Sequence, residues 1–267
     1  MPPTMIKYWK LFKTYWSSGL VYRTNLIMWR FRQLLLTLMS LAIWQVLFTN
    51  QDQLFGYSSS QMIGYVFVTS IIQSVILATS LHGLAYEIYS GYLNMQLLRP
   101  QNIFTSLLSV DLADKSKNLL FSAVEGVIIF LLLKPDILLP RIEILGYFLL
   151  SLVLAAAIHF YITILFGCIG FWSPEVWAPK FLFFMVVDFT AGRLFPIDIL
   201  PEGVVNILKF TPFPTLIFIP TQIFLGKYNG NEIIINLATQ AVWAIILWWI
   251  STRVWHRGIK SYEATGQ

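Results

Sequence analysis

Residues 82–104 read HGLAYEIYSGYLNMQLLRPQNIF, a polar stretch that interrupts two long apolar runs. Apolar residues recur within it at three- and four-residue spacing, which predicts one short amphipathic helix ended by proline. The residues on that expected apolar face are Leu84, Ile88, Tyr92, Met95 and Leu98. Because such a segment is too short and too polar to cross a bilayer, we expect it to form a contact surface on the cytoplasmic side.

The composition on either side of this stretch is that of a membrane protein. Of the 267 residues, 57% are hydrophobic and only 12% are charged, and the mean hydropathy is +0.69. Soluble globular domains carry about 25% charged residues, so we predict an integral membrane protein. The net charge of +5 comes from basic residues that flank apolar runs rather than form one patch, which favours membrane orientation over nucleic-acid binding.

Six apolar segments predict an all-α membrane protein, with residues 1–267 forming a single transmembrane domain. The expected spans are residues 33–51, 61–81, 118–133, 144–172, 180–195 and 233–252. The third and fifth are shorter than the roughly 20 residues that a crossing helix needs. With both termini in the cytoplasm, 13 of the 18 Lys and Arg residues fall on cytoplasmic segments. This excess is the expected positive-inside pattern.

Two further elements are expected at the membrane surfaces. Residues 5–16 place Met and aromatic side chains on one helical face and lysines largely on the other, which is typical of an interfacial helix. Residues 196–226 are apolar but contain five prolines. Irregular backbone at membrane depth must be covered by protein or water. We therefore expect an external re-entrant hairpin between the fifth and sixth spans.

Three polar residues lie inside the expected spans, namely Glu125, His159 and Asp188. A charge at the bilayer centre costs about 2.5 to 3.5 kcal/mol on insertion scales, so such residues usually face a bundle interior or a wet cavity. The alternative is that each one bonds to a neighbouring helix or lies near the interface. Both interpretations stay open at this point.

Motifs for nucleotide and metal chemistry are absent from the sequence. There is no G-x-x-x-x-G-K-[ST], H-E-x-x-H or G-x-S-x-G, and the three histidines are far apart. The single cysteine, Cys168, excludes an internal disulfide. We expect no catalytic group, metal or cofactor on this chain, and any use of ATP is expected to belong to a partner.

Four stretches, taken in order, resemble the membrane subunit of bacterial ABC exporters of the ABC-2 family. They are Tyr22-Arg23, Glu87 to Pro100 with its G-x-L-x-x-x-L-L-R-P run, Leu194 to Pro220 with LFPIDILP and TPFPTLIFIP, and the tail WHRGIKSYEATG. The resemblance implies a permease of six spans in the bacterial inner membrane. It also implies pairing with a second permease, and two separate ABC ATPase subunits that carry ATP and Mg.

The resemblance also assigns roles to three segments. It implies that residues 82–104 form the coupling helix, residues 4–20 the connecting helix and residues 196–226 the external re-entrant element. The candidate ATPase-coupling residues are Glu87, Gly91, Leu98, Arg99 and Pro100. The alternative for this stretch is a solvated loop with incidental charges.

Phenylalanines and prolines between residues 181 and 220 predict an apolar passage for a hydrophobic or amphipathic cargo, capped by a rigid, broken helix pair. The pathway or gate candidates are Glu125, Asp188, Phe195, Pro201 and Phe213. The alternative is that these rings face lipid and pack the hairpin.

The expected function is that of a dimeric export permease driven by separate ATPases. A stand-alone secondary transporter or channel is the first alternative, and it would predict internal repeats, of which the sequence shows no convincing example. A membrane-embedded lipid-modifying enzyme is the second, and it would need a polar catalytic cluster at one membrane face.

Overall fold

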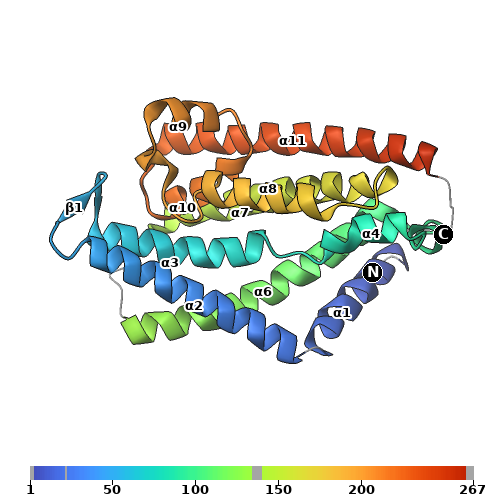
Figure 1. Ribbon diagram of the computed structural model, residues 1–267, viewed down its shortest axis with the longest axis horizontal. Coiled ribbons are helices and arrows are strands. Elements are labelled where there is room, and N and C mark those ends of the chain that lie inside the picture. Colours follow the sequence, from blue (N-terminus) through green and yellow to red (C-terminus); the bar gives the residue numbers. More distant parts are fainter. Residues whose placement is uncertain (1–2, 22, 134–139, 263–267) are drawn as a thin grey trace.

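The computed structural model describes residues 3–21, 23–133 and 140–262. Tyr22 and the last residues of the tail, both part of the resemblance, lie outside this range. The longer helices run roughly lengthwise, and α1 lies at the same end of the molecule as the C-terminal end of α11 (Figure 1). The helices are α1 Pro3–Val21, α2 Arg23–Leu47, α3 Ser59–Ile76, α4 Leu84–Tyr89, α5 Leu93–Leu97, α6 Ile103–Leu133, α7 Ile142–Cys168, α8 Trp177–Thr190, α9 Glu202–Leu208, α10 Phe218–Phe224 and α11 Gly230–Ser261. Short 3-10 helices are η1 Leu81–Gly83, η2 Ile169–Phe171, η3 Ile197–Ile199 and η4 Phe213–Thr215, and the strands β1 Gln53–Leu54 and β2 Tyr57–Ser58 form an antiparallel pair.

The prediction of an all-α membrane protein is confirmed. Four of the described helical stretches are long and apolar enough to cross a membrane: α2, α3, α7 with η2, and α11. The short fifth segment forms α8, which has 14 residues and is below the roughly 20 that a crossing helix needs.

The predicted start of the third span, residue 118, lies inside a longer helix. Helix α6 begins 15 residues earlier, at Ile103. Its charged turns continue the helix because they pair along it: Lys115 Nζ lies 2.8 Å from Asp111 Oδ1, and Lys117 Nζ lies 2.9 Å from Asp114 Oδ1. Pairs at this spacing stabilise a helix, so residues 111–117 belong to α6 and not to a loop before it.

The prediction of one amphipathic helix over residues 82–104 is wrong. The chain forms η1, α4 and α5, and Gly91 separates the last two with a φ of +80°, a conformation that glycine adopts without steric cost. This turn changes the helical register. Leu93 is fully buried, whereas Tyr92 and Leu98, which were expected on the buried face, are 52% and 85% exposed.

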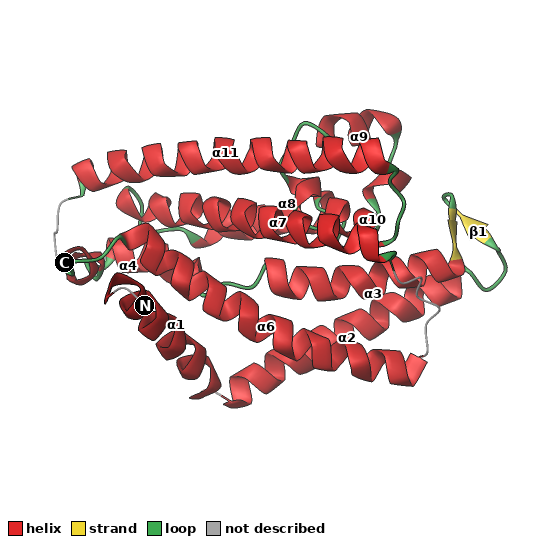
Figure 2. Ribbon diagram, turned by 180° about the vertical axis from the view of Figure 1, so that it is seen from behind, coloured by secondary structure: helices red, strands yellow, loops and turns green. Residues whose placement is uncertain are grey.

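Residues 196–226 form a set of short helices at the end of the molecule that also carries β1 and β2 (Figure 1). Pro196, Pro201 and Pro212 directly precede η3, α9 and η4, and Pro220 lies in the first turn of α10, where proline is tolerated. Helix α10 is almost entirely buried and contacts α3 and α7. Seen from behind, α9 and α10 lie at the opposite end of the molecule from α1 and α4 (Figure 2).

Candidate functional site

Helix α4 is held against the end of α7 by glycines that leave no room for a side chain. A Cβ on Gly167 would lie 2.5 Å from Leu84 Cδ2, and a Cβ on Gly170 of η2 would overlap the carbonyl group of Ala85. A flexible leucine side chain can move aside, but a backbone carbonyl group in a helix cannot move without disturbing the helix. We call the approach of Gly167 and Gly170 to Leu84 and Ala85 the glycine contact.

Aromatic side chains extend the glycine contact to α6 and α11. The ring of Phe171 in η2 lies 5.4 Å from the ring of Trp255 in α11, and Trp255 lies 5.5 Å from Phe104 in α6. Both pairs are edge-to-face, a favourable arrangement for aromatic rings. Trp255 is only 2% exposed. A displacement of α4 therefore meets close-packed groups of three long helices rather than solvent.

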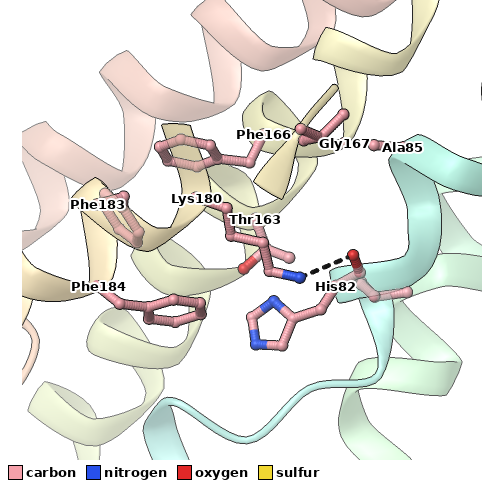
Figure 3. Close-up of a pocket in the computed structure, with 10 residues that line it drawn as sticks. His82, Ala85, Thr163, Phe166, Gly167, Lys180, Phe183 and Phe184 are labelled. Atoms are coloured by element: carbon pink, nitrogen blue, oxygen red, sulfur yellow. Dashed lines mark hydrogen bonds between the residues drawn. The ribbon is translucent and has the colours of Figure 1, made fainter. Parts of the chain in front are cut away.

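A small pocket links the same region to the start of α8 (Figure 3). Lys180 Nζ donates a hydrogen bond to the backbone carbonyl of His82 at 3.0 Å, and the ring of His82 meets the ring of Phe184 edge-on with centroids 5.2 Å apart. Burial, with a smaller effect of Lys180 and Lys115, lowers the pKa of His82 to about 4. The imidazole is therefore neutral at pH 7 and packs as an aromatic ring.

The opposite side of α4 and the end of α5 are turned to solvent. Tyr86 is 75% exposed, Tyr89 is 52% exposed and Leu98 is 85% exposed. We call these three residues the 86–98 surface. Sequence reasoning included Leu98 but missed Tyr86 and Tyr89. Their three-residue spacing, out of phase with Leu84 and Ile88, was the available signal.

The predicted coupling residues take different positions in this arrangement. Glu87 is half-buried, and its Oε2 accepts a hydrogen bond from Gln96 Nε2 of α5 at 2.9 Å. Burial raises the pKa of Glu87. Arg99 and Pro100 are exposed beside Leu98, and Gly91 forms the turn between α4 and α5. Glu87 thus connects α4 to α5, while the other side chains border the 86–98 surface.

Glu125, predicted as a pathway residue, pairs with a second helix. Its Oε2 lies 3.4 Å from Arg30 Nη1 of α2, and Arg30 also bonds to Asn118 and Ser122 of α6. Glu125 Oε1 is buried and has no hydrogen-bond partner among the described residues. The pairing favours the structural alternative for Oε2, while Oε1 retains capacity to accept a hydrogen bond.

The remaining pathway candidates do not gather around Glu125. Asp188 pairs with Arg193, five residues further along the chain. Phe195 and Phe213 pack against the main hydrophobic core, where the Phe213 ring lies 6.2 Å from that of Phe183. Pro201 is exposed at the start of α9. Two of the predicted lining residues are therefore core residues in this conformation.

A polar cluster that the sequence did not reveal closes the end opposite α4. Tyr57 of β2 donates a hydrogen bond to Asp198 Oδ2 at 2.6 Å, and Gln222 Nε2 of α10 donates to the Tyr57 hydroxyl at 2.7 Å. Burial and the neighbouring Asp198 raise the pKa of Tyr57 above its ordinary value, so the phenol stays protonated. We call these three residues the Tyr57 cluster. Tyr57 is 141 residues from Asp198, a separation that no sequence periodicity can report.

A group of side chains that could hold a metal ion is not found among the described residues. Within residues 3–21, 23–133 and 140–262, no three His, Cys, Asp or Glu side chains lie close enough to hold a metal ion. Cys168, the single cysteine, is buried and 1% exposed.

The four long apolar helices define a multi-pass membrane protein. The chain belongs to the ABC-2 family transporter proteins, whose family model matches residues 34–266. This family comprises membrane components of transporters that are not themselves catalytic, and membership implies association with the membrane and with an ABC ATPase. No curated protein matches the sequence.

Proposed function

We propose that this chain is the permease subunit of an ATP-driven exporter in the bacterial inner membrane. The six passes would be α2, α3, α6, α7 with η2, α8, and α11, with α1, α4 and α5 on the cytoplasmic side. The single observation that carries the proposal is the 86–98 surface, which exposes two tyrosines and a leucine on a segment fixed to the ends of the long helices. Exposed aromatic and apolar side chains mark interaction sites.

The 86–98 surface is proposed to receive a separate ATPase subunit, which binds ATP and Mg. Arg99 and Pro100 lie at its edge, where a charge contributes to orientation and rate of association more than to affinity. Because the glycine contact leaves no space between α4 and η2, a displacement of α4 on ATPase closure would pass to α7 and α11. Glu87 would keep α5 moving with α4 through its bond to Gln96.

Two permeases are proposed to form the pathway together, either two copies of this chain or this chain and a related one. Helix α2 supports this, because only 11% of the residues in its apolar stretch are buried by the rest of the chain. Its outward side chains include Met28, Trp29 and Phe31, each more than half exposed. A second permease would cover part of this face, and lipid would cover the remainder.

The exit is proposed to lie beneath η3 to α10, with the Tyr57 cluster closing it. Its members come from three segments, β2, η3 and α10, joined by hydrogen bonds that can break and re-form. Phe195, Pro201 and Phe213 would then belong to a gate for a hydrophobic or amphipathic cargo, and Glu125 and Asp188 would line the route.

The test is purification of the tagged full chain from its native membranes, with and without substitutions in the 86–98 surface. The wild-type chain is expected to co-purify with an ATPase subunit that contains a P-loop. The rate of ATP hydrolysis by the preparation should be in fixed ratio to the amount of that subunit. Tyr89→Ala together with Leu98→Asp is expected to lose both by at least tenfold. The matched control is Phe55→Ala with Phe210→Asp, two exposed positions at the end of the molecule opposite α4. Equal recovery of the P-loop chain in both double variants, or none with wild type, contradicts the proposal.

A further inference from the structure

A groove lies between α1, the α4–α5 segment and the first turns of α6. Its cavity volume is about 170 Å³, many times the roughly 10–15 Å³ that one water molecule needs by this measure. Asn102 N donates a hydrogen bond to the Tyr8 hydroxyl at 3.0 Å, which fixes α1 beside the chain that follows α5. Helix α1 also lies alongside α6 in both views (Figures 1 and 2).

One wall of the groove carries a half-buried carboxylate, Glu87, which forms no ion pair among the described residues. Glu87 lines the groove, and its Oε2 is held by Gln96. Burial raises the pKa of Glu87, and the hydrogen bond from Gln96 opposes this rise. A carboxylate removed from water is stabilised when a cation joins it. The groove therefore has a place for a positively charged group.

A basic group and a phenol line the same groove. Arg99 borders it, and its guanidinium makes no hydrogen bond with residues that the structure describes. Tyr15 of α1 faces the groove too, near enough to both Glu87 and Arg99 that each affects its ionisation. Guanidinium binds phosphate through paired hydrogen bonds. The groove thus offers one acidic and one basic contact to a single small molecule.

The floor of the groove and the exposed face of α1 indicate that the ligand is part of a lipid. Leu84, Leu107 and Val110 form a buried apolar floor. On the outer side of α1, Met5 and Trp9 are exposed, near lysines at positions 7, 10 and 13. Such a helix lies among lipid headgroups, which places the groove at headgroup depth. This step rests on the proposed membrane position of α1 and not on ATPase docking.

We propose that the groove binds the headgroup of an aminophospholipid, with the primary ammonium at Glu87 and Gln96 and the phosphate at Arg99 and Tyr15. The apolar floor takes the glycerol and the first methylene groups. An occupied groove joins α1 to the α4–α5 segment through the lipid, so the headgroup becomes part of the surface that holds Glu87 in place. The ligand is recognised by its amine and its phosphate together.

The test uses native mass spectrometry of the full chain released from detergent, with matched amounts of dihexanoyl phosphatidylethanolamine, phosphatidylcholine and phosphatidylglycerol. Phosphatidylethanolamine is expected to be retained at least tenfold more tightly than either of the others. A quaternary ammonium cannot donate a hydrogen bond to Glu87, and phosphatidylglycerol has no cation. Equal retention of the three lipids, or a preference for phosphatidylglycerol, overturns the proposal without reference to any variant.

Variants localise the binding and identify the source of the headgroup. Glu87→Gln and Arg99→Gln are each expected to weaken phosphatidylethanolamine retention about tenfold, whereas Glu143→Gln and Arg141→Gln, at exposed positions of the α7 start, leave it unchanged. Unchanged retention in the first two variants overturns the assignment to this groove. Soluble glycerophosphoethanolamine bound as tightly as the lipid overturns the lipid source. Because no ATPase is present, failure here is separate from failure of the proposed transport function.

Discussion

The two ends of the molecule are held together by different kinds of contact. At the α4 end, Gly170 brings the backbone of η2 against the backbone of α4, and no hydrogen bond between side chains is needed to hold the approach. At the opposite end, Tyr57, Asp198 and Gln222 join three separate segments through hydrogen bonds. A close steric fit transmits displacement, because packed groups cannot interpenetrate. Hydrogen bonds can exchange partners. Under the proposed function, the close-packed end would transmit displacement and the hydrogen-bonded end would open.

The largest effect is expected at the glycine contact. Gly170→Ala places a methyl group on the Ala85 carbonyl, and overpacking of this kind costs about 1–3 kcal/mol, with an immovable backbone neighbour giving the upper part of that range. We expect a marked drop in the thermal unfolding temperature of the purified chain. Gly146→Ala in α7 is the control, since a Cβ there meets nothing within 4 Å. Equal unfolding temperatures for the two variants would show that Gly170 and Ala85 are not held in a close steric fit.

An intermediate effect is expected in the Tyr57 cluster. Tyr57→Phe leaves the Asp198 carboxylate and the Gln222 amide without their shared hydroxyl, at a cost of about 1–2 kcal/mol. Limited proteolysis should then cut between residues 196 and 226 faster than in wild type, while sites near α4 are unaffected. Tyr147→Phe, at an exposed position of α7, is the control. Faster cleavage near α4 instead would show that the two ends are not independent.

The smallest effect is expected at His82. Its pKa falls from 6.5 to about 4 on folding, mainly through burial. Between these values the unfolded chain binds more protons than the folded chain, so stability rises with pH from about 4 to 6.5. His82→Phe should flatten the unfolding temperature over this interval. His256→Phe, at an exposed position, is the control for the loss of an imidazole. An unchanged pH dependence in His82→Phe would contradict the buried position of the imidazole.

Local patterns in the sequence predicted the elements of the fold, and long-range contacts decided their details. Hydropathy indicated helices at the six expected segments, and prolines indicated the short helices of residues 196–226. The register after Gly91 was missed, because its positive φ turns α5 so that Leu93 is buried and Leu98 is not. Periodicity assumes a continuous helix and has no way to include such a turn.

The two ends were not equally accessible to sequence reasoning. The segment that bears the 86–98 surface was found from its polarity, although Tyr86 and Tyr89 were overlooked. The Tyr57 cluster and the contact of Gly170 with Ala85 join residues far apart in the chain. Glu125 was recognised as an unusual intramembrane charge, but its partner, Arg30, is 95 residues away. The identity of such partners depends on how the helices pack, which one sequence does not specify.

Hydrogen exchange of the full-length chain, with and without its purified ATPase, tests the central claim most directly. The account predicts that ATPase binding slows exchange of the amides in residues 84–98 at least tenfold, through direct contact with the 86–98 surface. Without nucleotide, exchange in α10 should not change, since its contacts lie at the other end of the molecule. Unchanged exchange in residues 84–98 while a stable complex forms, with protection appearing elsewhere, would contradict the account.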